Sequence, residues 1–382
     1  MDYRGPGRVR ATQKPMPVIE HPEDALVRVT RACICGSDLH LYNGNVPDTR
    51  VGSTFGHEFV GVVEEIGPEV HKLKVGDHVL VPFNIACGKC HFCKQGLYGN
   101  CHESNPSATA VGGIFGYSHT AGGFAGGQAE YVRVPYANFG PTVIPEGMDL
   151  DDAVMLTDVV PTAYQAAEMA GIQPGDTVVV FGAGPVGIMA ARCCWLFGAG
   201  RVIVIDEYEY RLEFARNYAP AEVYNFREMD DPVVFIKKAT DWLGADCVID
   251  AVGAEAAGNA MQTITGRKLL LQAGSATALH WAINSVKKGG IVSIVGVYGP
   301  TDNLVPIGNV VNKGLTIRAN QASVKKHLPR LIEHVQNGIL NPKALITHRM
   351  RLADVADGYH IFSEKLDNCL KPVLIPDTAQ AA

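Results

Sequence analysis

The second half of the chain repeats one pattern: a short apolar, mostly β-branched run, a glycine-containing turn, an amphipathic segment, and then the next apolar run. Such runs occupy residues 177–181, 202–205, 247–249 and 291–295. Runs that are apolar throughout suit strands buried on both faces of a parallel sheet. Strands that alternate with helices predict a doubly wound α/β domain, which we expect over residues 158–315.

The first half of the chain has a different pattern. Short alternating runs, such as residues 25–29 and 59–63, are interrupted often by glycine and proline. This is typical of many short strands joined by turns, and it predicts a β-rich, barrel-like domain.

The C-terminal segment returns to this β-rich pattern after one helix, expected near Val324–Asn337. A last apolar run at 371–375 could rejoin the first domain. We therefore expect residues 1–157 and 316–382 to form one domain, into which the α/β domain is inserted. With 382 residues, the chain is long enough for two separate cores.

Composition excludes several classes of protein. Hydrophobic residues make up 47% and charged residues 19%, unlike a disordered or fibrous chain. A net charge of −6 argues against nucleic acid or an anionic membrane as a partner. No apolar run approaches the ~20 residues of a membrane span, and the first residues lack the apolar core of a secretory signal. We therefore expect a cytoplasmic protein.

Four of the ten cysteines lie close together in the sequence, at Cys87, Cys90, Cys93 and Cys101. In a chain without an export signal, such a cluster indicates metal rather than disulfides. Thiolates at this spacing can surround a tetrahedral zinc ion at ~2.3 Å and leave no open position, as in structural zinc sites. There are two alternatives to a zinc site. The cysteines could be four free thiols, or they could include a redox dithiol pair, although such a pair would not need four cysteines.

A second potential metal site is scattered along the chain, at Cys35, His57 and Asp158. A catalytic zinc ion needs three protein ligands and one position left open for water or substrate. Each residue alone has another explanation. His57 could be a core histidine, and Asp158 could be the N-cap of a helix that begins near Pro161. Their combination predicts a catalytic zinc site.

A glycine-rich turn follows the strand expected at 177–181 and opens a helix. Its sequence is Gly182-Ala183-Gly184-Pro185-Val186-Gly187. Gly182 permits the tight turn, Gly184 lets a pyrophosphate approach the backbone, and Gly187 brings helix and strand close together. The helix N-terminus then favours the phosphate charge. Between a strand and a helix, this motif predicts a dinucleotide-binding site.

The type of dinucleotide is indicated by acidic residues at the end of the next strand. Asp206 lies nineteen positions after Gly187, where a carboxylate can accept hydrogen bonds from the adenosine ribose. The same charge, with Glu207 beside it, would repel a 2′-phosphate. NAD is therefore favoured over NADP, although Arg211 could meet a phosphate.

Several segments together resemble the zinc-containing, medium-chain alcohol dehydrogenases over nearly the whole chain. They are CICGSDLH, GHEFVGVVEEIG, KVGDHVLVP and CGKCHFCKQGLYGNC. Two more, LTDVVPTAYQAA and GGQAEYVRVP, are most similar to the formaldehyde dehydrogenases that work without glutathione. The resemblance implies a GroES-like β-rich catalytic domain, a Rossmann coenzyme domain, two zinc ions, NAD and a homodimer or homotetramer.

The resemblance also implies roles at the catalytic zinc. Cys35, His57 and Asp158 would be its ligands, and Asp158 departs from the many relatives that carry cysteine there. Glu58 would be an alternative or transient ligand. Asp38 would accept a hydrogen bond from a ligating imidazole, as metal-bound histidines usually require.

Further roles implied by the resemblance concern the proton and the cofactor. Ser37 and His40 would form a proton relay through the cofactor ribose; a turn serine and a surface histidine are the alternatives. Gly36 stands where some relatives carry an arginine for the pyrophosphate. The remaining cofactor contacts would be Arg211 at the adenosine ribose, Val295 and Val297 along the nicotinamide, and Lys371 at the pyrophosphate. Lys371 could equally be a surface lysine.

The sequence therefore predicts an NAD-linked alcohol or aldehyde dehydrogenase in which a zinc-bound alkoxide gives hydride to NAD. Residues 258–280 interrupt the strand pattern and could form a loop over NAD, which would allow aldehyde dismutation.

A polyol or L-threonine dehydrogenase stays open as an alternative, because GSDLHLYNG and GHEFVG also resemble those enzymes. A nucleotide-binding protein without chemistry would lack the catalytic ligands. Tyr117 and His119 could line a substrate entrance or belong to a glycine-rich surface loop.

Overall fold

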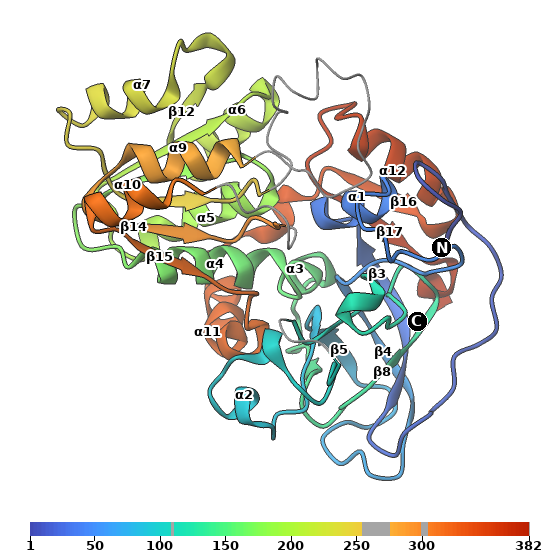
Figure 1. The fold of residues 1–382 in the computed structure, drawn as a ribbon. Coiled ribbons are helices and arrows are strands. Elements are labelled where there is room, and N and C mark those ends of the chain that lie inside the picture. Colours follow the sequence, from blue (N-terminus) through green and yellow to red (C-terminus); the bar gives the residue numbers. More distant parts are fainter. Residues whose placement is uncertain (108–110, 254–275, 299–304, 382) are drawn as a thin grey trace. The chain divides into compact units, whose positions relative to one another are not determined.

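The computed structural model describes residues 1–107, 111–253, 276–298 and 305–381 (Figure 1). The chain forms two compact units. The first contains Met1–Pro161 and Gln321–Ala382, and the second contains Thr162–Asn320. The predicted fold class is confirmed: the first unit is rich in β-structure and the second is a doubly wound α/β unit.

The first unit is built on a seven-stranded sheet in the order β16-β17-β3-β4-β5-β9, with β8 pairing with β3. Its strands are β3 (Ala25–Cys33), β4 (Phe59–Ile66), β5 (His78–Val81), β8 (Tyr131–Val134), β9 (Thr142–Val143), β16 (His348–Arg351) and β17 (Pro372–Ile375). Neighbours are antiparallel except β16 and β17. The expected last strand does rejoin this unit, because Val373 of β17 pairs with Cys33 of β3.

One face of this sheet carries an apolar core. Val27 and Val29 of β3 pack with Val63 of β4 and Val79 of β5, and all four are fully buried. Most of the residues between them along the strands are buried as well, so both faces of the sheet are largely covered. Two smaller sheets complete the strands, β1 (Asp2–Tyr3) with β2 (Val9–Arg10) and β6 (Asn84–Ile85) with β7 (Gly113–Ile114).

Helices of the first unit lie mostly between or after strands. They are α1 (Gly36–Tyr42), α2 (His91–Lys94), α3 (Leu150–Met155), α11 (Val324–Gln336) and α12 (Val355–Ser363). The helix expected near Val324–Asn337 is thus confirmed as α11. Helix α4 (Val159–Ala170) runs across the division between the units and begins two residues before the expected start at Pro161.

The second unit is a six-stranded parallel sheet in the order β12-β11-β10-β13-β14-β15. Its strands are β10 (Thr177–Phe181), β11 (Arg201–Asp206), β12 (Glu222–Asn225), β13 (Ala245–Asp250), β14 (Val286–Ile294) and β15 (Thr316–Ala319). All four predicted runs lie in strands, except that β14 ends one residue earlier than expected. The order reverses between β10 and β13, which is where open α/β sheets bind ligands, at the carboxyl ends of the strands.

Helices accompany these strands along the chain, as the alternation predicts. They are α5 (Pro185–Leu196), α6 (Glu209–Tyr218), α7 (Pro232–Ala239), α9 (Thr277–Ser285) and α10 (Ile307–Lys313). Most of the loop expected at 258–280 lies outside the described residues, but residues 277–280 belong to α9 and so are helical instead. In the described ranges, no helix has both the length and the apolarity that crossing a membrane requires.

Candidate metal centres and nucleotide site

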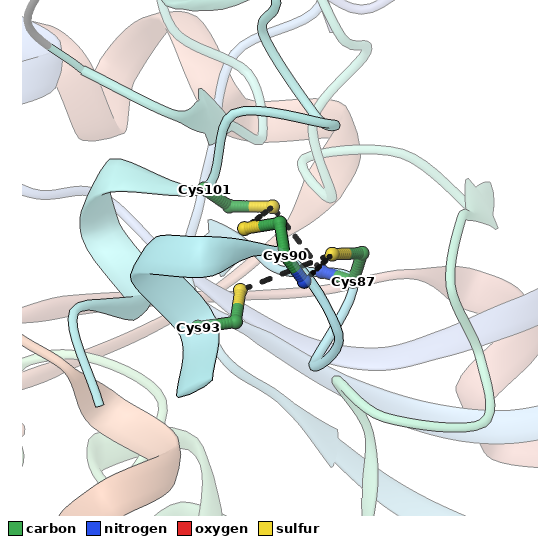
Figure 2. Close-up of side chains that lie close together, drawn as sticks. All are labelled: Cys87, Cys90, Cys93 and Cys101. Atoms are coloured by element: carbon green, nitrogen blue, oxygen red, sulfur yellow. Dashed lines mark hydrogen bonds between the residues drawn. The ribbon is translucent and has the colours of Figure 1, made fainter. Parts of the chain in front are cut away.

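The four clustered cysteines meet at one point of the first unit (Figure 2). Their sulfur atoms all lie within 4.8 Å of one another. The Cys87–Cys93 and Cys90–Cys101 sulfur pairs are both 4.0 Å apart. Four thiolates at ~2.3 Å from a tetrahedral zinc ion lie about 3.8 Å apart. The four side chains therefore fit a closed zinc site with little movement.

Backbone amides hold this group of thiols in place. The amides of Lys89 and Cys90 donate to Cys87 Sγ at 3.4 and 3.3 Å, and the Cys87 amide donates to Cys101 Sγ at 3.3 Å. Hydrogen bonds from the Cys93 thiol and the Cys87 amide lower the pKa of Cys101 to about 4. These donors favour the thiolate form of Cys101, the form that binds metal. The hydrogen bond with Cys101 in turn raises the pKa of Cys93, and burial raises the pKa of Cys87.

The scattered residues also come together, because β3 and β4 are antiparallel neighbours. Cys35 follows the end of β3, while His57 and Glu58 precede the start of β4, opposite it. Asp158 precedes α4. Ligand atoms of these four residues lie within 4.8 Å of one another, and apart from the four-cysteine site they form the only such group in the described part of the chain.

Distances within this second group match a tetrahedral metal site. Asp158 Oδ2 lies 3.8 Å from Cys35 Sγ and 3.3 Å from His57 Nε2. Zinc–ligand bonds of ~2.1–2.3 Å put such atoms about 3.4–3.6 Å apart. Asp158 does precede a helix, as its interpretation as an N-cap predicts, but its carboxylate faces the side chains of Cys35 and His57. His57 is buried, as a core histidine would be, yet it lies between two carboxylates.

Asp38 lies behind the imidazole of His57. Its Oδ1 is 3.3 Å from His57 Nδ1, and its Oδ2 accepts the amide of Cys35 at 2.9 Å. Burial lowers the pKa of His57, but Asp38 and Asp158 outweigh burial and raise it well above its usual value. This much negative charge around one imidazole is suited to a cation.

Glu58 and Lys371 form a buried ion pair beside this group. Lys371 Nζ lies 2.6 Å from each carboxylate oxygen of Glu58, and neither side chain is more than 1% exposed. Burial lowers the pKa of Lys371, and Glu58 more than reverses this effect and raises it. The interpretation of Lys371 as a surface lysine is therefore wrong.

The residues expected to form the proton relay lie on α1. Ser37 Oγ is 3.3 Å from His57 Nε2, so the hydroxyl reaches the metal-ligand group. His40 is only 7% exposed, so its interpretation as a surface histidine is wrong.

The glycine-rich segment around residue 117 is only partly a surface loop. Residues 112–116 are buried. Burial raises the pKa of Tyr117. Tyr117 also lies close enough to the second group of metal ligands for the charges of His57, Asp38 and Cys35 to affect this pKa. His119 is half-buried, and its Nδ1 is 3.1 Å from the Asp48 carbonyl oxygen.

Sequence reasoning missed two polar residues behind Asp38. The Gln128 side chain donates to Asp38 Oδ2 at 3.2 Å, and its carbonyl oxygen accepts the Tyr359 hydroxyl at 2.9 Å. Gln128 lies within the GGQAEYVRVP segment, but a neutral amide carries no signal of its own.

In the second unit, the glycine turn has the predicted geometry. Gly182 has a φ of +94°, which disfavours other residues, and a Cβ on Gly187 would lie 1.9 Å from the Gly182 carbonyl oxygen. Helix α5 therefore packs as close to β10 as glycine allows. A Cβ on Gly184 would have nothing within 4 Å, so the backbone there is open to a ligand. Pro185 and Val186 begin the helix.

Asp206 ends β11 beside this turn. Its Oδ2 accepts the amide of Ala183 at 2.6 Å, and its Oδ1 accepts the amides of Glu207 and Tyr208 at 2.7 and 3.0 Å. The carboxylate is thus fixed next to the glycine motif.

Arg211 and Val295–Val297 also lie at this carboxyl edge. The Arg211 guanidinium is 5.0 Å from the Tyr208 ring centre, and its Nε donates to the Tyr210 hydroxyl at 3.1 Å. The amides of Val295 and Gly296 donate to the carbonyl oxygen of Asp250, the last residue of β13. Val297 touches the turn after β13, because a Cβ on Gly253 would lie 2.4 Å from the Val297 nitrogen.

Comparison with known proteins identifies the family to which the chain belongs. Residues 21–146 match the family "Alcohol dehydrogenase GroES-like domain", and residues 185–268 match "Zinc-binding dehydrogenase". A relative in Bacillus subtilis, the uncharacterized zinc-type alcohol dehydrogenase-like protein AdhB, is 42% identical over 98% of this chain and 99% of its own. The glutathione-independent formaldehyde dehydrogenase of Pseudomonas aeruginosa is 36% identical over 85% of this chain and 81% of its own.

A solved structure agrees. Alcohol dehydrogenase TADH from Thermus sp. ATN1 superimposes with a TM-score of 0.84 at 35% identity, covering 98% of this chain and 99% of that one. With its β-rich unit, its doubly wound unit and two candidate zinc sites, the chain belongs to the zinc-dependent alcohol dehydrogenase family of oxidoreductases.

Proposed function

We propose that the chain is a zinc-dependent, NAD-linked dehydrogenase that interconverts short alcohols and aldehydes, including formaldehyde in its hydrated form. The observation that carries this proposal is the meeting of Cys35, His57 and Asp158 at metal-ligand distances. Three protein ligands leave one position of a tetrahedral zinc ion open for the substrate. Cys87, Cys90, Cys93 and Cys101 would hold a second, structural zinc ion.

Bound zinc would supply a Lewis acid that lowers the pKa of a substrate hydroxyl. The protein's own residues prepare the site for it. Asp38 Oδ1 faces His57 Nδ1 at 3.3 Å, where it would favour the hydrogen on that nitrogen and leave the Nε2 lone pair for the metal. Lys371 holds the carboxylate of Glu58 beside the three ligands, where Glu58 could act as an alternative ligand.

The released proton needs a route away from the substrate. Ser37 Oγ lies next to the ligand group and would take the proton, which would then pass through the cofactor ribose to His40. The pH–rate profile of His40→Ala tests this step. We expect lower activity that added imidazole buffer partly restores; a profile equal to that of the parent would rule out the relay.

NAD is the cofactor that we propose. Gly182, Gly184 and Gly187, with Pro185 and Val186 at the start of α5, would bind the pyrophosphate. Asp206 would bind the adenosine ribose with Arg211 nearby, and its negative charge disfavours NADP. Val295 and Val297 would contact the nicotinamide.

We propose formaldehyde and other short aldehydes, with the corresponding alcohols, as the substrates. The Pseudomonas aeruginosa relative and two sequence segments favour formaldehyde and short aldehydes. A polyol or L-threonine dehydrogenase on the same scaffold is the second candidate. We propose a cytoplasmic protein, because thiols at a four-cysteine zinc site must stay reduced. We also propose a homodimer or homotetramer, as the resemblance to the family implies.

A substrate panel combined with metal analysis tests the proposal. Formaldehyde, short primary alcohols, benzyl alcohol, polyols and threonine would each be assayed with NAD and with NADP, for cofactor reduction and for dismutation. We expect two zinc ions per chain and turnover of short alcohols or aldehydes with NAD. Turnover of polyols or threonine alone would favour the second candidate. Zinc bound at the four cysteines alone, with no turnover of any substrate, would indicate a non-catalytic nucleotide-binding protein.

A further inference from the structure

A buried amide lies behind the proposed catalytic site. Gln128 is fully buried, and its Nε2 donates to the carbonyl oxygen of Cys33 at 3.0 Å and to Asp38 Oδ2 at 3.2 Å. Its Oε1 accepts the Tyr359 hydroxyl at 2.9 Å. A primary amide has two N–H donors on nitrogen, and here both are used, because Cys33 and Asp38 offer only acceptors. These partners allow one orientation of the amide.

This amide is one of two donors that orient the Asp38 carboxylate. Asp38 Oδ2 accepts two hydrogen bonds, one from Gln128 and one from the Cys35 amide. Asp38 Oδ1 is left facing His57 Nδ1 at 3.3 Å. Asp38 is fully buried, so bulk solvent does not reach its carboxylate. Without Gln128, one of the two donors that fix the carboxylate would be lost.

The other end of the amide is held by packing. Tyr359 lies in α12 and is fully buried. Its ring centre is 5.0 Å from that of Tyr42 and 6.4 Å from that of Phe55, so the ring and its hydroxyl have little freedom. Burial raises the pKa of Tyr359 well above its usual value, so the hydroxyl keeps its proton and continues to donate.

We propose that Gln128 and Tyr359 are positioning residues that fix Asp38, and through Asp38 the ring of His57, in the orientation that binds the catalytic zinc ion. This inference rests on the proposed function. Gln128 and Tyr359 come from segments far apart in the sequence and belong to neither group of candidate metal ligands. Partners of this kind typically change metal affinity 10–100-fold when they are removed.

The test measures how fast zinc leaves the protein. Zinc-loaded parent and variants are mixed with excess 4-(2-pyridylazo)resorcinol, and the two zinc ions are followed by absorbance. The phase that is missing in Cys35→Ser belongs to the catalytic site, and the other phase belongs to the four cysteines. Tyr359→Phe removes one hydroxyl and keeps the ring. Gln128→Met keeps the length of the side chain and removes the whole amide.

Tyr42→Phe is the matched control, because it removes a hydroxyl from the ring that packs against Tyr359 without touching Gln128. We expect release of the catalytic zinc to accelerate roughly tenfold in Gln128→Met and a few-fold in Tyr359→Phe. The four-cysteine phase should be unchanged in both, and Tyr42→Phe should match the parent.

The inference is overturned if catalytic zinc leaves Tyr359→Phe and any folded Gln128→Met at the parental rate. It is also overturned if both phases accelerate equally, since that indicates general loosening. Should Gln128→Met not fold, Tyr359→Phe decides alone. A parent that binds zinc only at the four cysteines would instead contradict the proposed function, so the two failures are distinguishable.

Discussion

Lys371 and Glu58 lie 313 positions apart in the sequence, yet Lys371 Nζ is 2.6 Å from both carboxylate oxygens of Glu58 in the interior of the first unit. The contact arises because β17, which follows Lys371, and β4, which follows Glu58, both pair with β3. A charge that is buried without its partner is far more costly than the pair itself. The ion pair therefore connects the C-terminal segment to the proposed active site.

The first prediction concerns the strength of this connection. Glu58→Gln leaves the Lys371 ammonium buried without a counter-charge. Lys371→Met likewise leaves the Glu58 carboxylate buried without a counter-charge. We expect each change to lower the free energy of unfolding by about 3 kcal/mol. The double variant should lose clearly less than the sum, because it leaves no unpaired charge.

Urea unfolding of the four proteins measures this coupling. Asp354→Asn is the control, because it breaks the exposed ion pair between Arg351 and Asp354 and should leave stability unchanged. Losses that simply add in the double variant would show that Glu58 and Lys371 are not coupled.

Local patterns in the sequence predicted most of the fold. The strands of the second unit were predictable because β-branched runs and the glycine turn are signals contained within a few consecutive residues. The four-cysteine site was predictable for the same reason, since Cys87 to Cys101 is one short segment. The second metal group depends on the pairing of β3 with β4 and on where α4 begins. Residue chemistry could therefore suggest Cys35, His57 and Asp158 as ligands, but no local pattern could show that they meet.

The residues that sequence analysis missed share one property. Gln128 and Tyr359 are neutral and come from separate segments, so neither composition nor spacing marks them. The partner of Lys371 was missed because β17 lies far along the chain from β4. Such contacts are set by long-range packing, and no local pattern encodes them.

The second prediction concerns the four-cysteine site. Cys93→Ser removes one thiolate, and we expect the variant to lose the structural zinc ion while it keeps the catalytic one. Because zinc binding stabilises a segment with little core of its own, the variant should unfold at a lower temperature and be cut by protease between residues 87 and 107. Metal analysis and thermal unfolding measure both effects.

Cys193→Ala provides the comparison for this experiment. Cys193 is buried in α5 and belongs to neither group of metal ligands. It should keep both zinc ions even if the altered core lowers its stability. Full zinc content in Cys93→Ser would argue against a four-thiolate site.

The third prediction concerns the choice between NAD and NADP. Asp206→Asn removes the charge that would repel a 2′-phosphate. We expect the ratio of kcat/KM for NADP to that for NAD to rise at least about tenfold, which corresponds to roughly 1.4 kcal/mol. The amide can replace only one of the two acceptor oxygens that bind backbone amides, so a stability loss of about 1 kcal/mol should accompany the change.

Glu207→Gln is the matched variant for this comparison. The Glu207 carboxylate is 2.6 Å from Arg227 Nη2, so its charge is already partly neutralised. Its effect on the NADP ratio should therefore be much smaller than that of Asp206→Asn. Equal effects, or a parent that prefers NADP, would contradict the role given to Asp206.

The fourth prediction concerns how stability depends on pH through Lys325 in α11. Lys325 Nζ donates to the Pro141 carbonyl oxygen at 2.9 Å and to Thr142 Oγ1 at 2.6 Å. Burial, with repulsion from Lys72, lowers the pKa of Lys325 from 10.5 to about 8. Between these values the unfolded chain binds a proton that the native protein does not, so this group makes stability rise with pH.

Lys325→Met removes this effect. Relative to the variant, we expect the parent to gain stability as the pH rises from about 8 to about 10.5, with a constant difference at lower pH. Urea unfolding at pH 7, 8, 9 and 10 measures the difference. Lys326→Met changes the exposed neighbour and should follow the parent at every pH. A parent–variant difference for Lys325→Met that stays flat, or that falls as the pH rises, would mean that the ammonium is not held in a desolvating environment.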